Sequence, residues 1–423
     1  MANEWKRESR LAIRKMRAPT TPIPSGSRRP LRVALFTDAD EFAGTERHIL
    51  ALAEGLREGG EAAVQIACLV PSALAERARE SGLPIIAIQK RGMIDLPAIR
   101  ILRKMLAAGE LDLVHSHNGR STFSAALAVA CAQTGSCVAT QHFLEPARLK
   151  STGVKRMIRT VAHRWTNSRV NHVLAISEAV RDAMVSRRDA PPEKITVVPN
   201  GISEPPLDSM TSHEAIRAEF GIAKDAPLIV CVARIEREKD IPSLVAAMAI
   251  VAASDPEARC LIVGHGTQQA ALSRQILDAG LERVVTLTGF RSNAMAFIRA
   301  ADLFVLPSLA EPFGLVILEA MALGKPVVAT AMGGPLEIVV SGETGVLVPP
   351  SAPGELADAI RRLLADPAAR AAMGRNGRRR FEERFTAARA AREILLVYKQ
   401  VLDAARKPDG LRQGSQPAAV AHP

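Results

Sequence analysis

Short apolar runs alternate with helical stretches along most of the chain, and this alternation restricts the fold more than any other feature. The first run, residues 31–36, is followed by a helical stretch at 45–55. Such alternation predicts parallel sheets in doubly wound α/β domains, with helices on both faces. Further strands are expected at residues 64–70, 85–88, 113–115, 137–141, 173–176, 195–198, 228–233, 260–264, 284–288, 303–307, 327–330 and 346–348.

The alternation is interrupted once, at Pro199-Asn200-Gly201 and the prolines that follow. We expect a linker there, because 423 residues are too many for one core and suit two α/β domains. The predicted domains span residues 31–203 and 204–385, and a last helix spans 386–406. Residues 1–30 are expected to form a flexible basic leader, and residues 407–423 a disordered tail.

Several classes of protein are excluded by composition. A hydrophobic content of 48% excludes wholesale disorder, and no apolar run reaches the length of a membrane span. The five cysteines form no CxxC pair, so reduced thiols and a cytoplasmic protein are expected, and a zinc site is not. Asp38 and Asp40 have the spacing of a metal-binding acidic pair, but they suit the end of the first strand better.

Two glutamates, Glu311 and Glu319, bracket a segment that predicts a loop, a helix and a buried strand. Pro312 suits the start of the helix and Gly324 suits its end. Eight helical residues rise about 12 Å, so two carboxylates at that spacing could contact two parts of one elongated ligand. Free amides at the helix start favour an anion, and we expect them at Phe313, Gly314 and Leu315. An ordinary amphipathic helix with two solvated glutamates is the alternative.

Arg234 and Lys239 follow the expected strand 228–233, five residues apart. Ligands of parallel sheets bind at the carboxyl ends of strands, where both cations could reach one diphosphate. A fixed pair of cations would stabilise the charge of a departing diphosphate without a metal ion. A solvated charged loop is the alternative.

Together these segments resemble glycosyltransferase family 4, the retaining group 1 glycosyltransferases, over residues 31–405. The resemblance implies the GT-B fold, with two facing Rossmann-like domains and a cleft between them, and a last helix that returns to the first domain. It implies a hexosyl transferase that uses a UDP- or GDP-sugar donor and needs no metal ion and no cofactor. The first domain would bind the acceptor and the second the nucleotide-sugar.

The resemblance also assigns roles to residues. Glu311 would orient hydroxyls of the donor sugar and Glu319 would bind the ribose, while Arg234 and Lys239 would hold the diphosphate. The backbone of Gly289 and Phe290 would meet the base, and the loop at Gly44 would lie beside the donor and acceptor. The chain departs from the family pattern at four positions, of which we expect Pro312 to alter donor choice: Ala43, Ala233, His265 and Pro312.

Two histidines alternate at the end of the strand predicted at 113–115. One should point into the packing of the sheet and the other toward the cleft. We expect a structural role for His115, and for His117 contact with the sugar or handling of a proton. Asn118 and Arg120 could meet the acceptor. Weaker matches to the family pattern occur at Ser177-Glu178 and at residues 333–337.

The net charge is +11, and the segment from Arg148 to Arg169 holds basic and apolar residues with no acidic one. A basic amphipathic helix can bind an anionic membrane surface, or it can be a solvated helix packed on its own domain. No nucleic-acid motif is present. We expect a glycan acceptor, lipid-linked if the segment binds membrane, and a protein that is cytoplasmic or peripheral at the inner membrane face. A nucleotide-sugar epimerase of the same shape and a non-catalytic adaptor are the alternatives.

Overall fold

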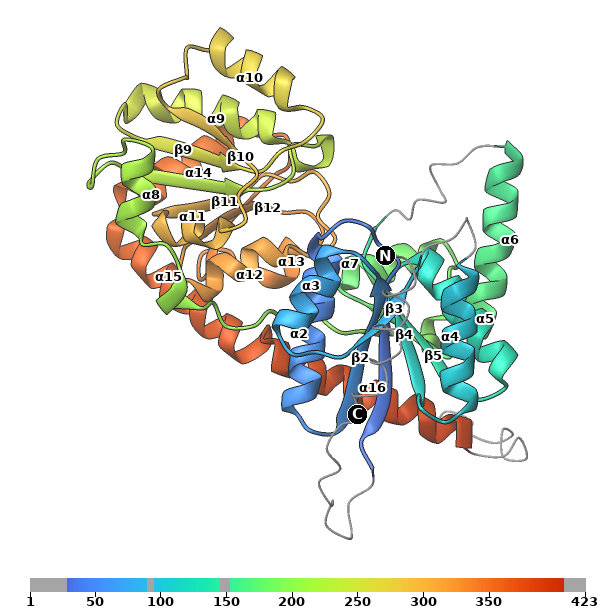
Figure 1. The fold of residues 1–423 in the computed structure, drawn as a ribbon. Helices are drawn as coiled ribbons and strands as arrows, with labels where there is room; N and C mark the ends of the chain where they lie inside the picture. Colours follow the sequence, from blue (N-terminus) through green and yellow to red (C-terminus); the bar gives the residue numbers. More distant parts are fainter. Residues whose placement is uncertain (1–28, 90–94, 145–152, 407–423) are drawn as a thin grey trace, which may run out of the picture. The chain divides into compact units, whose positions relative to one another are not determined.

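The computed structural model describes residues 29–89, 95–144 and 153–406. Most of the predicted basic leader, the predicted C-terminal tail and the basic residues Arg148 and Lys150 lie outside the described residues. The described residues from Leu31 onward belong to one compact unit. The fold contains two parallel sheets, and helices cover both faces of each (Figure 1).

The first sheet has seven parallel strands in the order β3-β2-β1-β4-β5-β6-β7. Its direction of winding reverses between β1 and β4, as in a Rossmann sheet. The strands are β1 (Leu31–Phe36), β2 (Ala62–Leu69), β3 (Ile85–Ile88), β4 (Leu113–Ser116), β5 (Ser136–Gln141), β6 (His172–Ala175) and β7 (Ile195–Val197). The prediction of a doubly wound parallel sheet is confirmed here.

The second sheet has six parallel strands in the order β10-β9-β8-β11-β12-β13 and reverses between β8 and β11. Its strands are β8 (Leu228–Val232), β9 (Arg259–Val263), β10 (Val285–Gly289), β11 (Leu303–Leu306), β12 (Val327–Thr330) and β13 (Gly345–Val348). The predicted second α/β domain is therefore present, and each strand lies within a residue or two of the expected position.

The helices connect and cover the strands. Those of the first sheet are α2 (Gly44–Glu58), α3 (Ala73–Glu80), α4 (Leu96–Ala107), α5 (Gly119–Ala132), α6 (Gly153–Arg169), α7 (Glu178–Ser186) and the 3-10 helix η2 (Pro192–Lys194). The second has η3 (Leu207–Ser209), α8 (His213–Glu219), η4 (Arg237–Lys239), α9 (Ile241–Ser254), α10 (Gln269–Asp278), α11 (Ala294–Ala300), α12 (Leu315–Ala322), α13 (Pro335–Ile338), α14 (Pro353–Ala365) and α15 (Pro367–Arg384). The last helix is α16 (Ala387–Arg406).

Neighbouring residues of the central strands enter different hydrophobic cores. Along β1, Val33 and Leu35 pack with α2, α3 and α16, whereas Ala34 and Phe36 pack in the core that contains α4 and α5. This alternation follows from the two-residue period of a strand, because successive side chains point to opposite faces. Both faces of the sheet are apolar and covered, which explains why the strands appear in the sequence as continuous apolar runs.

The last helix, α16, packs against α2 of the first sheet although the whole second sheet precedes it in sequence. Its side chains Ile394 and Tyr398 are buried in the same core as Val33 and Leu35. Thr386, the residue before α16, forms an isolated parallel β-bridge with Ile202.

The segment between the two motif glutamates differs from the prediction. Helix α12 begins at Leu315, with Gly314 at its N-cap in a left-handed conformation (φ 109°). Pro312 is therefore not the start of the helix, and only four residue steps, a rise of about 6 Å, separate Leu315 from Glu319 along the axis. The positive φ of Gly314 prevents the helix from extending backwards, since an α-helix requires negative φ. The predicted end is confirmed, because Gly324 follows the last turn with φ 66°.

Helix α6 contains most of the predicted basic segment and is not long and apolar enough to cross a membrane, and neither is any other helix among the described residues. Met157, Ile158 and Val161 expose 60–63% of their surface. Trp165, expected on the same face, is half-buried and packs against Phe123 with ring centroids 5.5 Å apart. The exposed apolar face of α6 therefore consists of Met157, Ile158 and Val161.

Candidate functional site

The predicted diphosphate and sugar residues meet at the point where the second sheet reverses direction. Arg234 and Lys239 follow β8, and Glu311 follows β11, the neighbouring strand. The carboxyl ends of two strands that wind in opposite directions leave a crevice where ligands bind in doubly wound sheets. The structure thus brings these three residues to the edge of the sheet where a ligand would be expected.

Lys239 and Glu311 form an ion pair, with Lys239 Nζ 2.6 Å from Glu311 Oε2. Both side chains are largely buried, and Ser308 Oγ also donates to the same carboxylate oxygen at 3.3 Å. Arg234 is exposed instead and pairs with Glu238 four residues later, at 2.7 Å. Each predicted diphosphate cation is therefore paired with a carboxylate.

Two glycines hold the backbone of the Glu311 loop. Gly334 N donates to Glu311 O at 2.9 Å, and a Cβ added to Gly334 would lie 2.1 Å from Phe313 O. A Cβ on Gly333, where φ is 68°, would lie 2.2 Å from Glu311 O. Side chains at these two positions would displace the loop. This explains why glycines stand at the start of the weak family match at residues 333–337.

Glu319 is buried on α12 and accepts a hydrogen bond from Arg47 on α2, with Arg47 Nη1 2.8 Å from Glu319 Oε1. Its other oxygen, Oε2, has no hydrogen-bond partner among the described residues. Burial raises the pKa of Glu319, and the neighbouring charge of Arg47 lowers it again. Arg47 was not predicted as a site residue. It belongs to the segment around Gly44, whose match to the family pattern is weak.

The expected anion-binding amides belong only in part to the helix start. Leu315 opens α12, whereas Phe313 and Gly314 precede it. The side chain of Phe313 is buried and its ring lies against that of Phe385, with centroids 6.3 Å apart. Only the backbone of Phe313 is therefore available to a ligand. Of the three amides expected at the helix start, that of Leu315 lies in the helix, that of Gly314 belongs to the N-cap and that of Phe313 precedes it.

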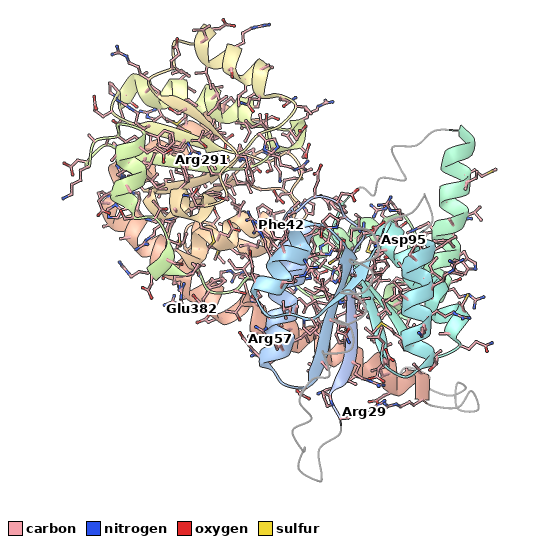
Figure 2. The ribbon with its side chains drawn as sticks, in the orientation of Figure 1. Arg29, Phe42, Arg57, Asp95, Arg291 and Glu382 are labelled. Atoms are coloured by element: carbon pink, nitrogen blue, oxygen red, sulfur yellow. The ribbon has the colours of Figure 1, made fainter. Side chains whose placement is uncertain are left out.

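Gly44 begins α2, and a Cβ at this position would touch Leu315 Cδ1 at an ordinary 3.6 Å. The two predicted elements, the Gly44 loop and the start of α12, thus lie close together. Phe42 (Figure 2) lies just before Gly44. The guanidinium of Arg77 lies 4.0 Å from the centroid of its ring. Phe42 is held by this contact, which gives the loop a defined entry into α2.

Gly289 and Phe290, expected to meet the base, lie at the end of β10, where Gly264 N donates to Gly289 O at 2.9 Å. Gly289 has a positive φ of 73°, and Phe290 is 67% exposed. The ring of His265 meets that of Phe290 edge-on, with centroids 5.8 Å apart. An exposed aromatic ring at the carboxyl edge of the sheet is free to stack on a planar group.

His115 and His117 are both fully buried at the end of β4. His115 is bonded at both nitrogens, to Tyr398 Oη and to Thr140 Oγ1, each at 2.6 Å, which matches the structural role expected for it. His117, expected to point toward the cleft, is fully buried and packs against the ring of His142. Contact of His117 with a sugar stays a prediction.

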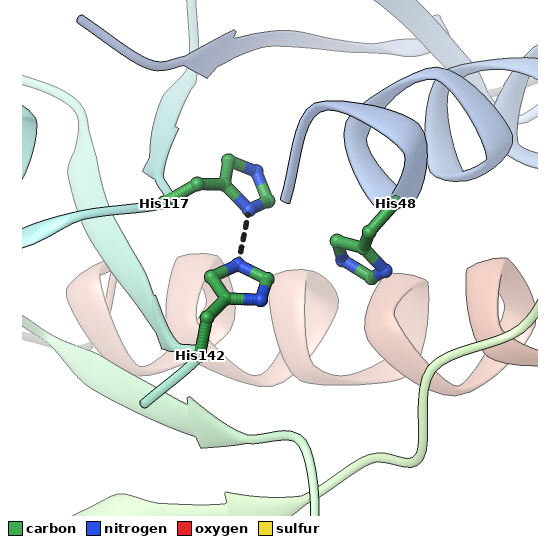
Figure 3. Close-up of side chains that lie close together, drawn as sticks. All are labelled: His48, His117 and His142. Atoms are coloured by element: carbon green, nitrogen blue, oxygen red, sulfur yellow. Dashed lines mark hydrogen bonds between the residues drawn. The ribbon is translucent and has the colours of Figure 1, made fainter. Parts of the chain in front are cut away.

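His48 on α2 and His142 after β5 were missed as neighbours of His117 (Figure 3). Nothing in the sequence spacing unites them, since β1, β4 and β5 bring three distant segments together only in the folded sheet. Burial lowers the pKa of His48 to about 4 and lowers the pKa values of His117 and His142 well below the usual range. All three imidazoles are therefore neutral at pH 7.

The two residues expected to meet the acceptor are engaged in local contacts. Asn118 caps α5, accepting from Arg120 N and Ser121 N at its side-chain oxygen. The guanidinium of Arg120 pairs with the carboxylate of Asp38, which explains the position of this acidic residue after β1.

The weak match at Ser177-Glu178 corresponds to a contact with the Glu311 loop. Ser177 Oγ donates to Pro312 O at 2.7 Å, and the carboxylate of Glu337 accepts from Glu178 N and Ala179 N. The start of α7 is thus bonded to the segments around Glu311 and Gly334.

Two family models match adjoining parts of the chain. The model described as Glycosyltransferase Family 4 matches residues 42–204, and the one described as glycosyl transferases group 1 matches residues 212–380. The chain is 30% identical to the alpha-maltose-1-phosphate synthase of Mycobacterium tuberculosis over 400 residues, which cover 88% of this chain and 100% of the relative. It is 32% identical to the alpha-D-kanosaminyltransferase of Streptomyces kanamyceticus, over 54% of this chain and 60% of that enzyme.

Solved structures share the fold. HepE from Anabaena in complex with UDP and glucose superposes with a TM-score of 0.75 at 23% identity, over 88% of this chain and all of HepE. The sucrose-phosphate synthase of Thermosynechococcus elongatus has a TM-score of 0.67 at 25% identity over the same shares. Two Rossmann-like sheets, two adjoining family models and a full-length relative agree, so the chain is a glycosyltransferase of the GT-B fold and belongs to the group 1 glycosyltransferases, family 4.

Proposed function

We propose that this glycosyltransferase moves a hexosyl group from a UDP- or GDP-sugar to a glycan acceptor, with retention of anomeric configuration and with no metal ion at the diphosphate. The observation that carries the proposal is the contact between Lys239 Nζ and Glu311 Oε2 at 2.6 Å. The proposal rests on this contact because Lys239 is the cation expected to hold the diphosphate and Glu311 is the carboxylate expected to orient the sugar. The nucleotide-sugar itself is the only small molecule the proposed reaction requires. HepE, of the same fold, is described in complex with UDP and glucose, which supports a UDP-linked donor.

Three ion pairs would exchange partners when the donor binds. Arg234 and Lys239 would turn from their carboxylates to the diphosphate, and Glu319 would turn from Arg47 to hydroxyls of the ribose. Phosphate oxygens accept strong charge-assisted hydrogen bonds from both kinds of cation. The released carboxylate of Glu311 would then accept from hydroxyls of the sugar.

In the proposed reaction the bond between the anomeric carbon and the diphosphate oxygen breaks, and the acceptor hydroxyl bonds to that carbon on the same face. The proton of the hydroxyl passes to the departing phosphate oxygen. Negative charge grows on the diphosphate, and Arg234, Lys239 and the Leu315 amide at the start of α12 would stabilise it.

The acceptor we propose is lipid-linked, with the enzyme peripheral at the inner membrane face and acting in cell-envelope or exopolysaccharide synthesis. The exposed apolar face of α6, formed by Met157, Ile158 and Val161, supports this assignment because it lies on a helix with no acidic residue. Apolar side chains on a basic helix favour the interface of an anionic bilayer.

A nucleotide-release screen across UDP- and GDP-sugars, with and without glycan acceptors, tests the function. We expect release from one donor class that increases with acceptor, and a product with the anomeric configuration of the donor by NMR. Inversion would overturn the retaining assignment. Formation of an epimeric nucleotide-sugar without free nucleotide would instead identify an epimerase.

A further inference from the structure

Three histidines from different parts of the first domain meet in one buried cluster. His48 comes from α2, His117 follows β4 and His142 follows β5 (Figure 3). Each offers one ring nitrogen, and these three atoms all lie within 4.8 Å of one another. The three side chains are at least 94% buried, so water does not separate them from one another as it would on a surface.

Hydrogen bonding leaves this cluster incompletely satisfied. His117 Nδ1 and His142 Nε2 lie 3.2 Å apart and share one hydrogen, so one nitrogen donates and the other accepts. His48 Nε2 and His117 Nε2 have no partner among the described residues. A buried polar atom without a partner costs about 1–3 kcal/mol, so a ligand that satisfied His48 Nε2 would stabilise the fold.

We propose that His48, His117 and His142 form a binding site for Zn²⁺. Zinc binds neutral imidazole nitrogens at about 2.0–2.1 Å, so two ligands of one tetrahedral ion stand about 3.3 Å apart. The separation of His117 Nδ1 and His142 Nε2, 3.2 Å, is close to this value, and His48 offers a ring nitrogen within 4.8 Å of a ring nitrogen of each of the other two. Three histidines with an open fourth position form a recognised zinc ligand set, and water or hydroxide would fill that position.

The protonation state and the ligand chemistry favour this ion. Metal ligation requires unprotonated imidazoles, and burial keeps all three neutral at pH 7. Mg²⁺ and Ca²⁺ prefer oxygen ligands, which these three side chains do not offer. His115 is excluded as a ligand because Tyr398 and Thr140 occupy both of its nitrogens.

The proposed ion would oppose sugar transfer. Zinc held at this site would engage the ring of His117, which we expect to contact the donor sugar in the proposed reaction. This consequence rests on the proposed function, whereas the binding of zinc does not. We therefore expect Zn²⁺ to inhibit transfer and removal of divalent ions by a chelator to leave transfer intact.

Titration of chelator-treated, tag-free protein with Zn²⁺, by calorimetry and by competition with a chromophoric chelator, tests the site. We expect one ion per chain and a loss of affinity in His48→Gln and His142→Gln larger than the ~10–100-fold that loss of an outer-shell partner costs. His213→Gln, which changes an exposed histidine of α8, should bind as the wild type does. Equal affinity in all four proteins, or no stoichiometric binding, would overturn the site.

X-ray absorption on zinc-loaded wild type needs no variant and so covers the case in which a variant does not fold. Three imidazoles in the first coordination sphere are expected, and fewer than three would contradict the proposal. Zinc should also raise the unfolding temperature of the wild type and of His213→Gln but not of His142→Gln. If zinc binds but no nucleotide-sugar supports transfer, the proposed function fails while the zinc site stands.

Discussion

Lys239 Nζ lies 2.6 Å from Glu311 Oε2, and this largely buried ion pair joins the carboxyl ends of β8 and β11. Removing one partner of a buried pair leaves the other charge unpaired at a cost of about 3–5 kcal/mol. We expect Lys239→Met to lower the free energy of unfolding by about that amount and to reduce kcat by about 100-fold or more, because a cation at the diphosphate is lost. Urea unfolding and steady-state kinetics measure the two effects.

The double variant Lys239→Met/Glu311→Leu separates stability from catalysis. It should recover most of the lost stability, since no unpaired charge remains, and stay inactive. Lys224→Met, at an exposed lysine, serves as the control and should change neither quantity. Recovery of activity in the double variant would argue against any part for this pair in transfer.

Glu319 is expected to bind the ribose only when ionised. Burial raises its pKa, and Arg47 at 2.8 Å holds the pKa down. Arg47→Gln should raise the pKa of Glu319 further, so that donor binding is lost at a higher pH as the pH falls. The pH dependence of KM for the donor measures this shift. Arg57→Gln, on the same helix (Figure 2), should leave the profile unchanged, and an identical shift in both variants would refute the assignment.

Gly334 has an ordinary helical φ of −56°, so any residue could adopt its backbone conformation, and only space limits the side chain. An added Cβ would lie 2.1 Å from Phe313 O, which forces the Glu311 loop to move. We expect Gly334→Ala to cost about 1–3 kcal/mol in unfolding free energy and to lower kcat. Gly354→Ala, exposed on α14 with nothing within 4 Å, should instead stabilise by about 0.5–1 kcal/mol.

The buried histidines predict acid lability. The pKa of His48 falls from 6.5 to about 4 on folding. Between these two pH values the imidazole is protonated in the unfolded chain and neutral in the folded chain. The contribution of neutral His48 to the free energy of unfolding is fully present above pH 6.5. It is lost as the pH falls toward 4, by about 1.4 kcal/mol for each pH unit. Urea unfolding at pH 7.5, 6 and 5, in the presence of a chelator, should show a steep decline to which His115, His117 and His142 add. His48→Gln should reduce the slope by about one proton, and a flat profile in the wild type would contradict the burial described.

The exposed apolar face of α6 predicts binding to anionic vesicles. Each apolar side chain buried in the interface contributes about 1.5–3 kcal/mol, so Met157→Gln/Ile158→Gln/Val161→Gln should weaken partitioning more than about 10-fold. Co-sedimentation with anionic and with neutral vesicles measures it. Leu277→Gln on α10 and Leu396→Gln on α16 remove equally exposed apolar side chains and should have no effect. Unchanged binding in the triple variant would remove the basis for a membrane-bound acceptor.

The sheets could be predicted from the sequence because each strand is a continuous apolar run, which follows from burial on both faces. The same local signal placed Arg234, Lys239 and Glu311 at strand ends. It could not show that Gly314 would adopt a positive φ before the helix, nor that Gly333 and Gly334 would pack against the loop that precedes it. Nor could it bring His48 and His142 to His117, because that contact depends on strand order and not on sequence spacing.

The packing of α16 against α2 has a consequence for biosynthesis. Residues 204–385 form an uninterrupted stretch that holds all six strands of the second sheet, whereas the first core lacks Ile394 and Tyr398 until the last helix has been translated. Gly55 of α2 leaves room for α16 at a point where a Cβ would lie 2.8 Å from Ala387 O. On the ribosome residues 204–385 can therefore complete their core first. The first domain, although it is synthesised earlier, keeps the apolar face of α2 uncovered until α16 is available. The order of folding would run opposite to the order of synthesis, and α2 would be the surface for a chaperone to shield in the meantime.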